Sequence, residues 1–111
     1  MKIENKENLV ILADEYTNPK EFASFLEYQI PKKFKGQNVV LNLLNYKDMD
    51  LETLLLYLKV SNIHRKTKHS FVIVNQSVPI DDIPMEMVVV PTLQEAEDVV
   101  EMEDIERDLG F

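Results

Sequence analysis

The chain has 111 residues, 45% of them hydrophobic, and a formal net charge of −8 at pH 7. This length suits a single domain with an ordinary apolar core. There is no cysteine, which excludes disulfides, thiolate zinc sites and cysteine nucleophiles and suits a reducing compartment. The charged N-terminus lacks an apolar signal segment, and no apolar run is long enough to span a bilayer. We therefore expect one cytoplasmic domain, residues 1–111, that does not bind membranes.

The charge is spread unevenly along the chain. Residues 1–31 carry a net charge of −3, residues 32–68 of +5 and residues 69–111 of −10. An acidic chain repels nucleic acid, which needs clustered cations, so we do not expect nucleic acid as a partner. Two interpretations of the middle segment stay open: a solvated, lysine-rich surface, which we favour, or a local basic face.

The N-terminal third predicts two short strands and a helix. The apolar run Leu9–Leu12 follows the polar residues 5–8, which indicates two strands joined by a tight turn. Asn18 and Pro19 are typical of an N-cap and a first helical position. Pro31 has no N–H to donate, so the helix should end or kink near Ile30.

The middle third predicts a strand, a helix and a second strand. The continuous apolar run Val39–Leu44 is typical of a strand covered on both faces. A helix should follow from about Leu51 to Lys66, with Asp50 as its N-cap. The run Ser70–Asn75 predicts the next buried strand.

The last third predicts a loop or single turn over Pro79–Pro84, a short strand over Met87–Val90 and a final helix. Thr92 and Glu95 have the spacing of a capping box, and the helix should continue toward Leu109. Because helices alternate with buried strands, the chain is predicted to be α/β, with a single layer of helices on a mixed, mostly parallel sheet of about five strands.

Two segments have the pattern of interaction surfaces. The helix from Leu51 is apolar nearly all round, so it lies centrally in the domain or uses its spare face for a partner or dimer contact. In the acidic C-terminal helix, an apolar stripe either docks on the sheet or lies in a partner's groove; it consists of Val99, Met102, Ile105 and Leu109. We predict that residues 101–111, an acidic helical extension, contribute mainly to association and little to folding.

The residues needed for catalysis are not found in a recognisable pattern. The two histidines, His64 and His69, are separated by lysines that repel a cation, so we expect a pair of surface histidines and no metal site. The only glycines, Gly36 and Gly110, cannot form a phosphate-binding loop. We therefore expect no enzyme activity, no catalytic residue and no cofactor.

The element order and two local motifs resemble the STAS domain, the fold of bacterial anti-sigma factor antagonists. The motifs are Val39–Leu44 followed by Met49–Leu54, and the strand Phe71–Asn75. The resemblance implies a partner surface around the start of the second helix, which comprises Asp48, Asp50, Leu51, Glu52 and Thr53. In that family a serine after the aspartate is phosphorylated and the added charge switches binding off. Leu51 stands at that position here, and Thr53 stands where the family has glycine.

The second half of the chain also resembles short bacterial proteins that are labelled ribonuclease Z. The segments that carry this likeness are Ser61–Lys66, Ser70–Val74, Val90–Ala96 and Glu103–Phe111. A two-zinc nuclease needs a histidine cluster that this chain lacks. We therefore expect a protein-binding regulator or adaptor that forms a homodimer or binds another protein. The alternatives are an RNA-processing accessory protein associated with ribonuclease Z and, third, a small-ligand carrier.

Overall fold

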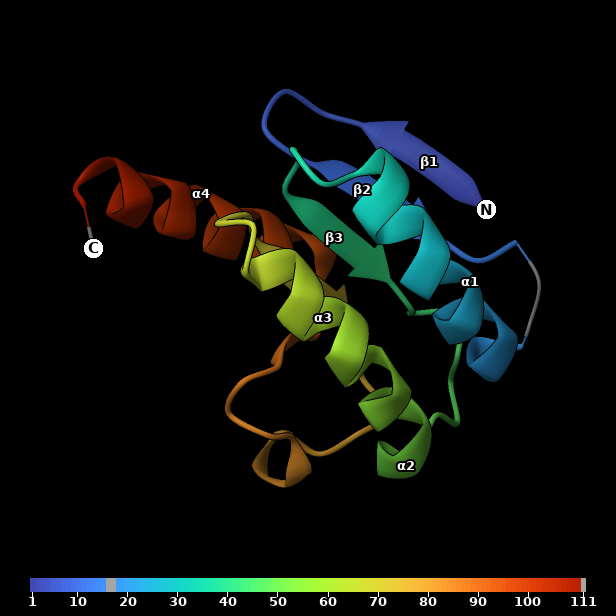
Figure 1. The fold of residues 1–111 in the computed structure, drawn as a ribbon. Coiled ribbons are helices and arrows are strands. Elements are labelled where there is room, and N and C mark those ends of the chain that lie inside the picture. Colours follow the sequence, from blue (N-terminus) through green and yellow to red (C-terminus); the bar gives the residue numbers. More distant parts are fainter. Residues whose placement is uncertain (16–17, 111) are drawn as a thin grey trace.

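The computed structural model describes residues 1–15 and 18–110. The chain folds as an α/β domain around a five-stranded sheet (Figure 1). In chain order, its elements are β1 (Lys2–Asn5), β2 (Val10–Ala13), α1 (Pro19–Lys33), β3 (Val39–Asn42), α2 (Leu51–Leu54), the 3₁₀ turn η1 (Leu55–Tyr57), α3 (Leu58–Arg65), β4 (Phe71–Val74), the 3₁₀ turn η2 (Ile80–Asp82), β5 (Val88–Val90) and α4 (Leu93–Asp108).

The strands lie in the sheet in the order in which they occur in the chain, β1-β2-β3-β4-β5. β1 is antiparallel to β2, and each of the other neighbouring pairs is parallel. The mixed, mostly parallel sheet predicted from the sequence is therefore confirmed. This topology places the carboxyl ends of β2 to β5 at one edge of the sheet.

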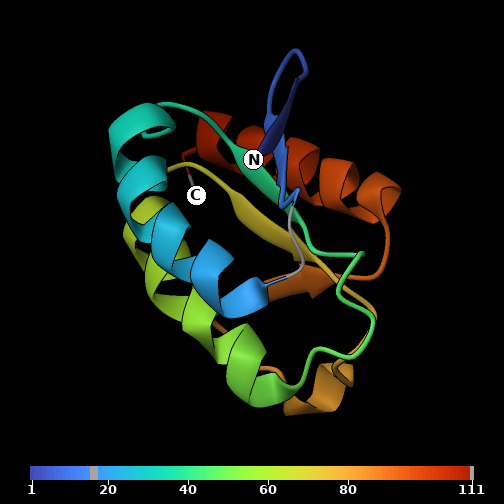
Figure 2. The same ribbon diagram turned by 90° about the vertical axis from the view of Figure 1, so that its right-hand side faces the viewer.

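Helices cover both faces of the parallel strands. Figure 2 shows α1, α2 and α3 as a layer on one face and α4 alone on the other. Since side chains alternate along a strand, Val39 and Leu41 belong to the core beneath α1 and α3, whereas Val40 packs with Ala96 and Val100 of α4. The prediction that β3 is covered on both faces is confirmed.

The predicted helix starts hold, because capping is a local property. The side chain of Asn18 accepts hydrogen bonds from the amides of Lys20 and Glu21, both at 3.1 Å. Thr92 accepts one from the amide of Glu95, also at 3.1 Å. The carboxylate of Glu95 accepts the Thr92 hydroxyl hydrogen at 3.0 Å, so only half of the predicted capping box is realised.

Two predicted helix boundaries need correction. α1 does not end at Ile30 but continues through Pro31 to Lys33. Pro31 lies in the last turn, where its missing N–H removes one bond, to the carbonyl four residues before it, and the amide of Phe34 still donates to the Ile30 carbonyl at 3.0 Å. The predicted helix 51–66 is interrupted by η1, with Tyr57 buried at the interruption.

The second helical segment has one buried side and one partly exposed side. Leu54, Tyr57 and Val60 are buried in the core. Leu55 and Leu56 are 37% and 42% exposed, so the spare face is only partly covered. One side of this segment therefore packs within the domain, and a partner or dimer contact stays a prediction for the exposed side.

Candidate partner-binding surface

The loop from Leu43 to Asp50 joins β3 to α2 at the carboxyl edge of the sheet, where ligands of α/β proteins are usually bound. Its first turn is set by Asn42, whose side-chain oxygen accepts the Leu44 amide at 3.1 Å. Where the loop turns inward, at the buried residues Leu43 and Tyr46, its carbonyl groups need partners within the protein. Two polar residues after β4 supply those partners.

Asn75 and Ser77 hold the loop in place from the neighbouring strand. The buried Asn75 amide donates to the carbonyl oxygens of Leu43 at 2.9 Å and Tyr46 at 3.1 Å. The Ser77 hydroxyl lies 2.9 Å from the Tyr46 carbonyl and 2.8 Å from that of Lys47. Buried polar groups satisfied in this way rigidify a loop. The segment before α2 is therefore a fixed platform.

Two tyrosine hydroxyls near this platform bind the segment between β2 and α1: one the residue after β2, the other the first residue of α1. Tyr46 donates to the carboxylate of Asp14, and Tyr57 donates to the carbonyl of Pro19 at 2.6 Å. Burial raises the pKa of both phenols, with the hydrogen bond to Asp14 adding to the effect at Tyr46. Both hydroxyls therefore stay protonated and act as donors at neutral pH.

Asp50 begins α2 as predicted, and Thr53 completes its cap. The Thr53 amide donates to the Asp50 carboxylate at 2.8 Å. Hydrogen bonds from the side chain and backbone of Thr53 lower the pKa of the Asp50 carboxyl, which stays ionised at the positive end of the helix. Thr53 itself is only 9% exposed. Its hydroxyl thus has a structural partner and little access to solvent.

Three of the five predicted residues at this surface reach solvent, namely Asp48, Asp50 and Glu52. Leu51 is half-buried and packs against the core. A shallow pocket of about 300 Å³ lies beside them; its wall includes Pro19, Asn45, Tyr46, Lys47, Asp48, Met49, Asp50 and Thr53. The surface is therefore a fixed, mainly acidic region beside a shallow hollow whose wall also includes the exposed Lys47.

The second predicted group lies elsewhere on the molecule. Met102, Ile105 and Leu109 are 60%, 53% and 68% exposed on the outer side of α4. Figures 1 and 2 place the C-terminal half of α4 at the opposite end of the sheet from α2 and on its other face. The structure thus does not bring the two predicted groups together.

The inner side of the same half-helix makes a polar network that sequence reasoning missed. Asn38, directly before β3, donates to the Asn8 carbonyl at 3.0 Å and to Asp104 at 3.0 Å, while its oxygen accepts the Ser70 amide at 2.8 Å. Arg107 donates to Asn38 at 3.2 Å and to Ser70 at 3.0 Å.

A further carboxylate on α4 extends this network to α3. Glu103 accepts the hydroxyl hydrogen of the buried Ser70 at 2.5 Å and pairs with Arg65 at 3.4 Å. The only sequence signal for the network was a polar residue directly before each of two apolar runs. Residues 101–108 are helical, as expected, but their inner side is bound to the domain.

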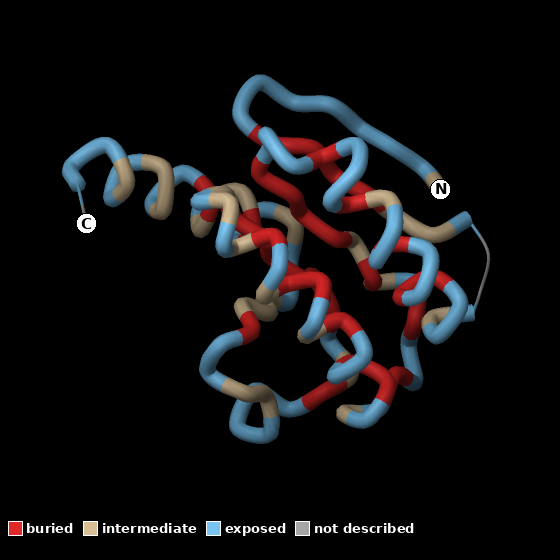
Figure 3. The backbone as a smooth tube through the Cα atoms, in the orientation of Figure 1, coloured by how far each residue is buried: buried red, intermediate tan, exposed pale blue. Residues whose placement is uncertain are grey.

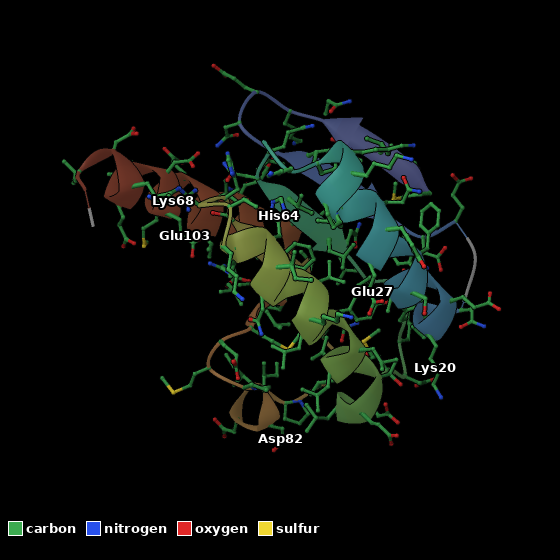
Figure 4. The ribbon with its side chains drawn as sticks, in the orientation of Figure 1. Lys20, Glu27, His64, Lys68, Asp82 and Glu103 are labelled. Carbon is green, nitrogen blue, oxygen red and sulfur yellow. The ribbon has the colours of Figure 1, made fainter. Side chains whose placement is uncertain are left out.

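One of the two histidines is not on the surface. His64, labelled in Figure 4, is 1% exposed. Its Nε2 lies 2.7 Å from the carbonyl oxygen of Gln37, to which it donates. Burial lowers the pKa of its imidazole. The expectation of two surface histidines is therefore wrong for His64, because the contact that buries it comes from the turn after α1. No group of three or more metal-ligating side chains occurs among the residues that the structure describes.

A comparison of the chain with protein-family models and with curated proteins finds no match. Across residues 1–15 and 18–110, none of the helices combines the length and apolar character that crossing a bilayer requires.

Proposed function

We propose that this chain is a non-enzymatic protein-binding module of STAS type, a regulator or adaptor whose binding face includes the acidic start of α2. The observation that carries the proposal is the fixed loop from Leu43 to Asp50. Its backbone is held by Asn75 and Ser77, while Asp48 and Glu52 extend into solvent beside it. A preorganised surface binds with a smaller loss of conformational entropy than a mobile one.

The polar side chains at this surface already have structural partners, which supports binding over catalysis. Tyr46 is bound to Asp14, and Asp50 is bound to Thr53. Asp48, Asp50 and Glu52 outnumber Lys47 among the exposed charged side chains here, so we propose a partner that presents a basic surface. The partner's recognition is expected to be constitutive, since Leu51 has no hydroxyl and the Thr53 hydroxyl is buried against Asp50.

Affinity capture with matched variants tests the proposal. Immobilised wild-type protein, an Asp48→Asn/Glu52→Gln double variant and a control Glu27→Gln/Glu86→Gln variant should be compared by quantitative mass spectrometry of proteins retained from lysate. Both variants remove two exposed charges, and neither touches the Asp50 cap. We expect the control to retain the same proteins as wild type and the Asp48/Glu52 variant to lose them. Equal capture by the two variants would contradict a binding role for the start of α2.

A second function, as an RNA-processing accessory protein, is favoured by one observation. The bond between His64 and Gln37 brings the C-terminal ends of α1 and α3 together. Five exposed lysines lie in or just beyond these ends: Lys32, Lys33, Lys35, Lys66 and Lys68. Cations at helix C-termini also stabilise the helix dipole, so this grouping has a structural explanation as well.

A further inference from the structure

β1 is an open edge of the sheet. All four of its residues, Lys2 to Asn5, are exposed. Figure 3 shows the whole strand as exposed, and in Figure 2 it extends beyond the helices on both faces. An uncovered edge strand presents unpaired N–H and C=O groups that can accept another strand.

The hydrogen-bond pattern identifies which backbone groups face outward. The Lys6 amide donates to the Leu9 carbonyl at 2.9 Å, so Lys6 and Leu9 form a hydrogen-bonded pair of the hairpin. In an antiparallel ladder such pairs alternate with non-hydrogen-bonded ones. With Glu4 opposite Ile11 and Lys2 opposite Ala13, Lys2 and Glu4 are directed toward β2. The N–H and C=O groups of Ile3 and Asn5 are therefore directed toward the open edge.

We propose that a second copy of this chain pairs antiparallel along β1, on a two-fold axis through Ile3. The two Ile3 residues then exchange both backbone hydrogen bonds across the axis. Lys2 of each copy lies opposite Glu4 of the other, in the non-hydrogen-bonded positions where facing side chains are closest. The sequence Lys2-Ile3-Glu4 is thus complementary in charge to itself, and the dimer contains a continuous ten-stranded sheet.

Charge also favours pairing about Ile3 over the registers that centre on Glu4 or Asn5. An axis through Glu4 would place the two Glu4 carboxylates opposite each other and Lys2 opposite Lys6, which is repulsive. An axis through Asn5 would place Lys6 of one copy opposite Glu4 of the other. The Lys6 ammonium already pairs with Glu97 at 2.9 Å, and Lys6 lies beyond the end of β1. Glu4 is 3.8 Å from Lys6, a distance that leaves the carboxylate available to a closer cation.

The side chain on the axis supports the same arrangement. Ile3 pairs with Leu12, so it lies on the α1 side of the sheet, and it is 46% exposed. Across the axis the two isoleucines meet on that face and cover each other. Four residues per copy bury less surface than a standard interface, so we expect a weak dimer, populated at roughly 0.1 mM and above.

Charge reversal at the two paired residues tests the proposal by sedimentation velocity over a range of concentrations. Lys2→Glu and Glu4→Lys should each weaken dimerisation by about tenfold or more, because each variant replaces two attractive pairs with two repulsive ones. The double swap Lys2→Glu/Glu4→Lys should restore it, and so should an equimolar mixture of the two single variants. Lys59→Glu, an exposed lysine on α3, should leave dimerisation close to that of wild type.

These variants distinguish the effect of the Lys2–Glu4 contact on dimerisation from the effect of the net charge of the chain. Lys2→Glu makes the chain more acidic, and Glu4→Lys makes it less acidic. If net charge controlled dimerisation, the first variant would weaken it and the second would strengthen it, whereas the proposal predicts that both weaken it. Dimers that respond to net charge alone would overturn the proposal. A wild-type chain that stays monomeric up to about 1 mM would also overturn it. Circular dichroism checks that each variant is folded.

Amide hydrogen exchange locates the interface independently. With rising protein concentration, the Ile3 and Asn5 amides should gain protection, while the Glu4 amide, already directed toward β2, should change little. Protection of Ile3 and Asn5 that arises only on adding another protein to a monomeric chain would also overturn the proposal, in favour of a foreign strand at this edge.

Discussion

Single buried polar side chains fasten distant parts of this chain to one another. His64 joins α3 to the turn after α1 through one hydrogen bond of 2.7 Å to Gln37. Its other ring nitrogen, Nδ1, is buried and has no hydrogen-bond partner in the part of the chain that the structure describes. The neutral ring therefore fits the site, whereas a protonated ring would carry a second N–H with no acceptor.

Stability should consequently fall in mild acid because of His64. Burial depresses its pKa in the folded state, while the unfolded chain has an ordinary histidine pKa of about 6.5. The unfolded state thus binds more protons as pH drops below about 6.5, and the contribution of neutral His64 is lost from there toward its folded pKa. Urea unfolding at pH 7 and pH 5 should show a smaller decrease in the free energy of unfolding for His64→Gln than for wild type.

The matched control for this prediction is the other histidine. His69 is half-buried beside the Thr67 backbone and adds to the lowering of the His64 pKa, so His69→Gln should reduce the pH dependence less than His64→Gln does. If His64→Gln lost as much stability between pH 7 and pH 5 as wild type, groups other than His64 would be responsible for the acid sensitivity.

Residues whose role depends on near neighbours were predictable, and those whose role depends on distant ones were not. Asn18, Asp50 and Thr92 cap the helices that follow them, since each needs only amides two or three residues away. His64 and Asn38 have partners 27 and 66 residues away. Neither spacing nor composition carries that information, so one was taken for a surface residue and the other was overlooked.

Among the elements, α4 has the most divided role. Ala96 and Val100 pack on the sheet, and the carboxylates of Glu103 and Asp104 continue this inner side into the polar network around Ser70 and Asn38. The outer side presents Met102, Ile105 and Leu109 to solvent. The sequence predicts a role in association for the whole segment 101–111, but its inner side also has contacts that stabilise the fold.

Deletion and substitution should therefore affect α4 differently. Removing residues 101–111 strips partners from the buried groups of Asn38 and Ser70, and we expect the free energy of unfolding to fall by about 2–4 kcal/mol. The triple substitution Met102→Gln/Ile105→Gln/Leu109→Gln alters only exposed positions and should change it by less than about 0.5 kcal/mol. Chemical denaturation of both variants measures the difference. A deletion with wild-type stability would mean that the polar network contributes nothing to folding.

The type and order of the elements could be predicted because apolar runs and capping residues repeat at the right periods. Element ends were less accurate: the first helix was expected to end or kink near Ile30, but α1 continues through Pro31 to Lys33. The interruption at η1 has no sequence signal, because Leu55 and Leu56 suit an α-helix as well as a 3₁₀ turn. Of the candidate surface, the acidic residues were predictable; the role of Asn75 and Ser77 was not, since it requires knowing that β3 and β4 are neighbours.

At the scale of the whole molecule, three cations pair with carboxylates of α4. Arg65 pairs with Glu103, Arg107 with Asp104 and Lys6 with Glu97. The acidic α4 thus lies against the region that would otherwise attract an anionic partner. The exposed lysines at the ends of α1 and α3 remain, within a protein whose net charge is −8.

We expect this protein to show no specific affinity for RNA. Fluorescence anisotropy with a labelled precursor transfer RNA should detect at most weak binding at low salt, lost by about 150 mM, as for non-specific phosphate contacts. Lys33→Glu/Lys66→Glu should abolish that residual signal. Tight binding that persists at 150 mM salt and is lost in this double variant would favour the RNA-processing function.

The position of α4 also has a consequence for the time course of folding. Neighbouring strands in the sheet are consecutive in the chain, so each strand from β2 to β5 can pair with the strand synthesised just before it as the polypeptide emerges from the ribosome. The face formed by Ile11, Val40, Val72 and Val74 acquires its cover only from α4, the last element. Until residues 93–108 have been synthesised, a nearly complete sheet displays a valine-rich surface to solvent, and this is the interval in which the nascent chain is most prone to aggregation.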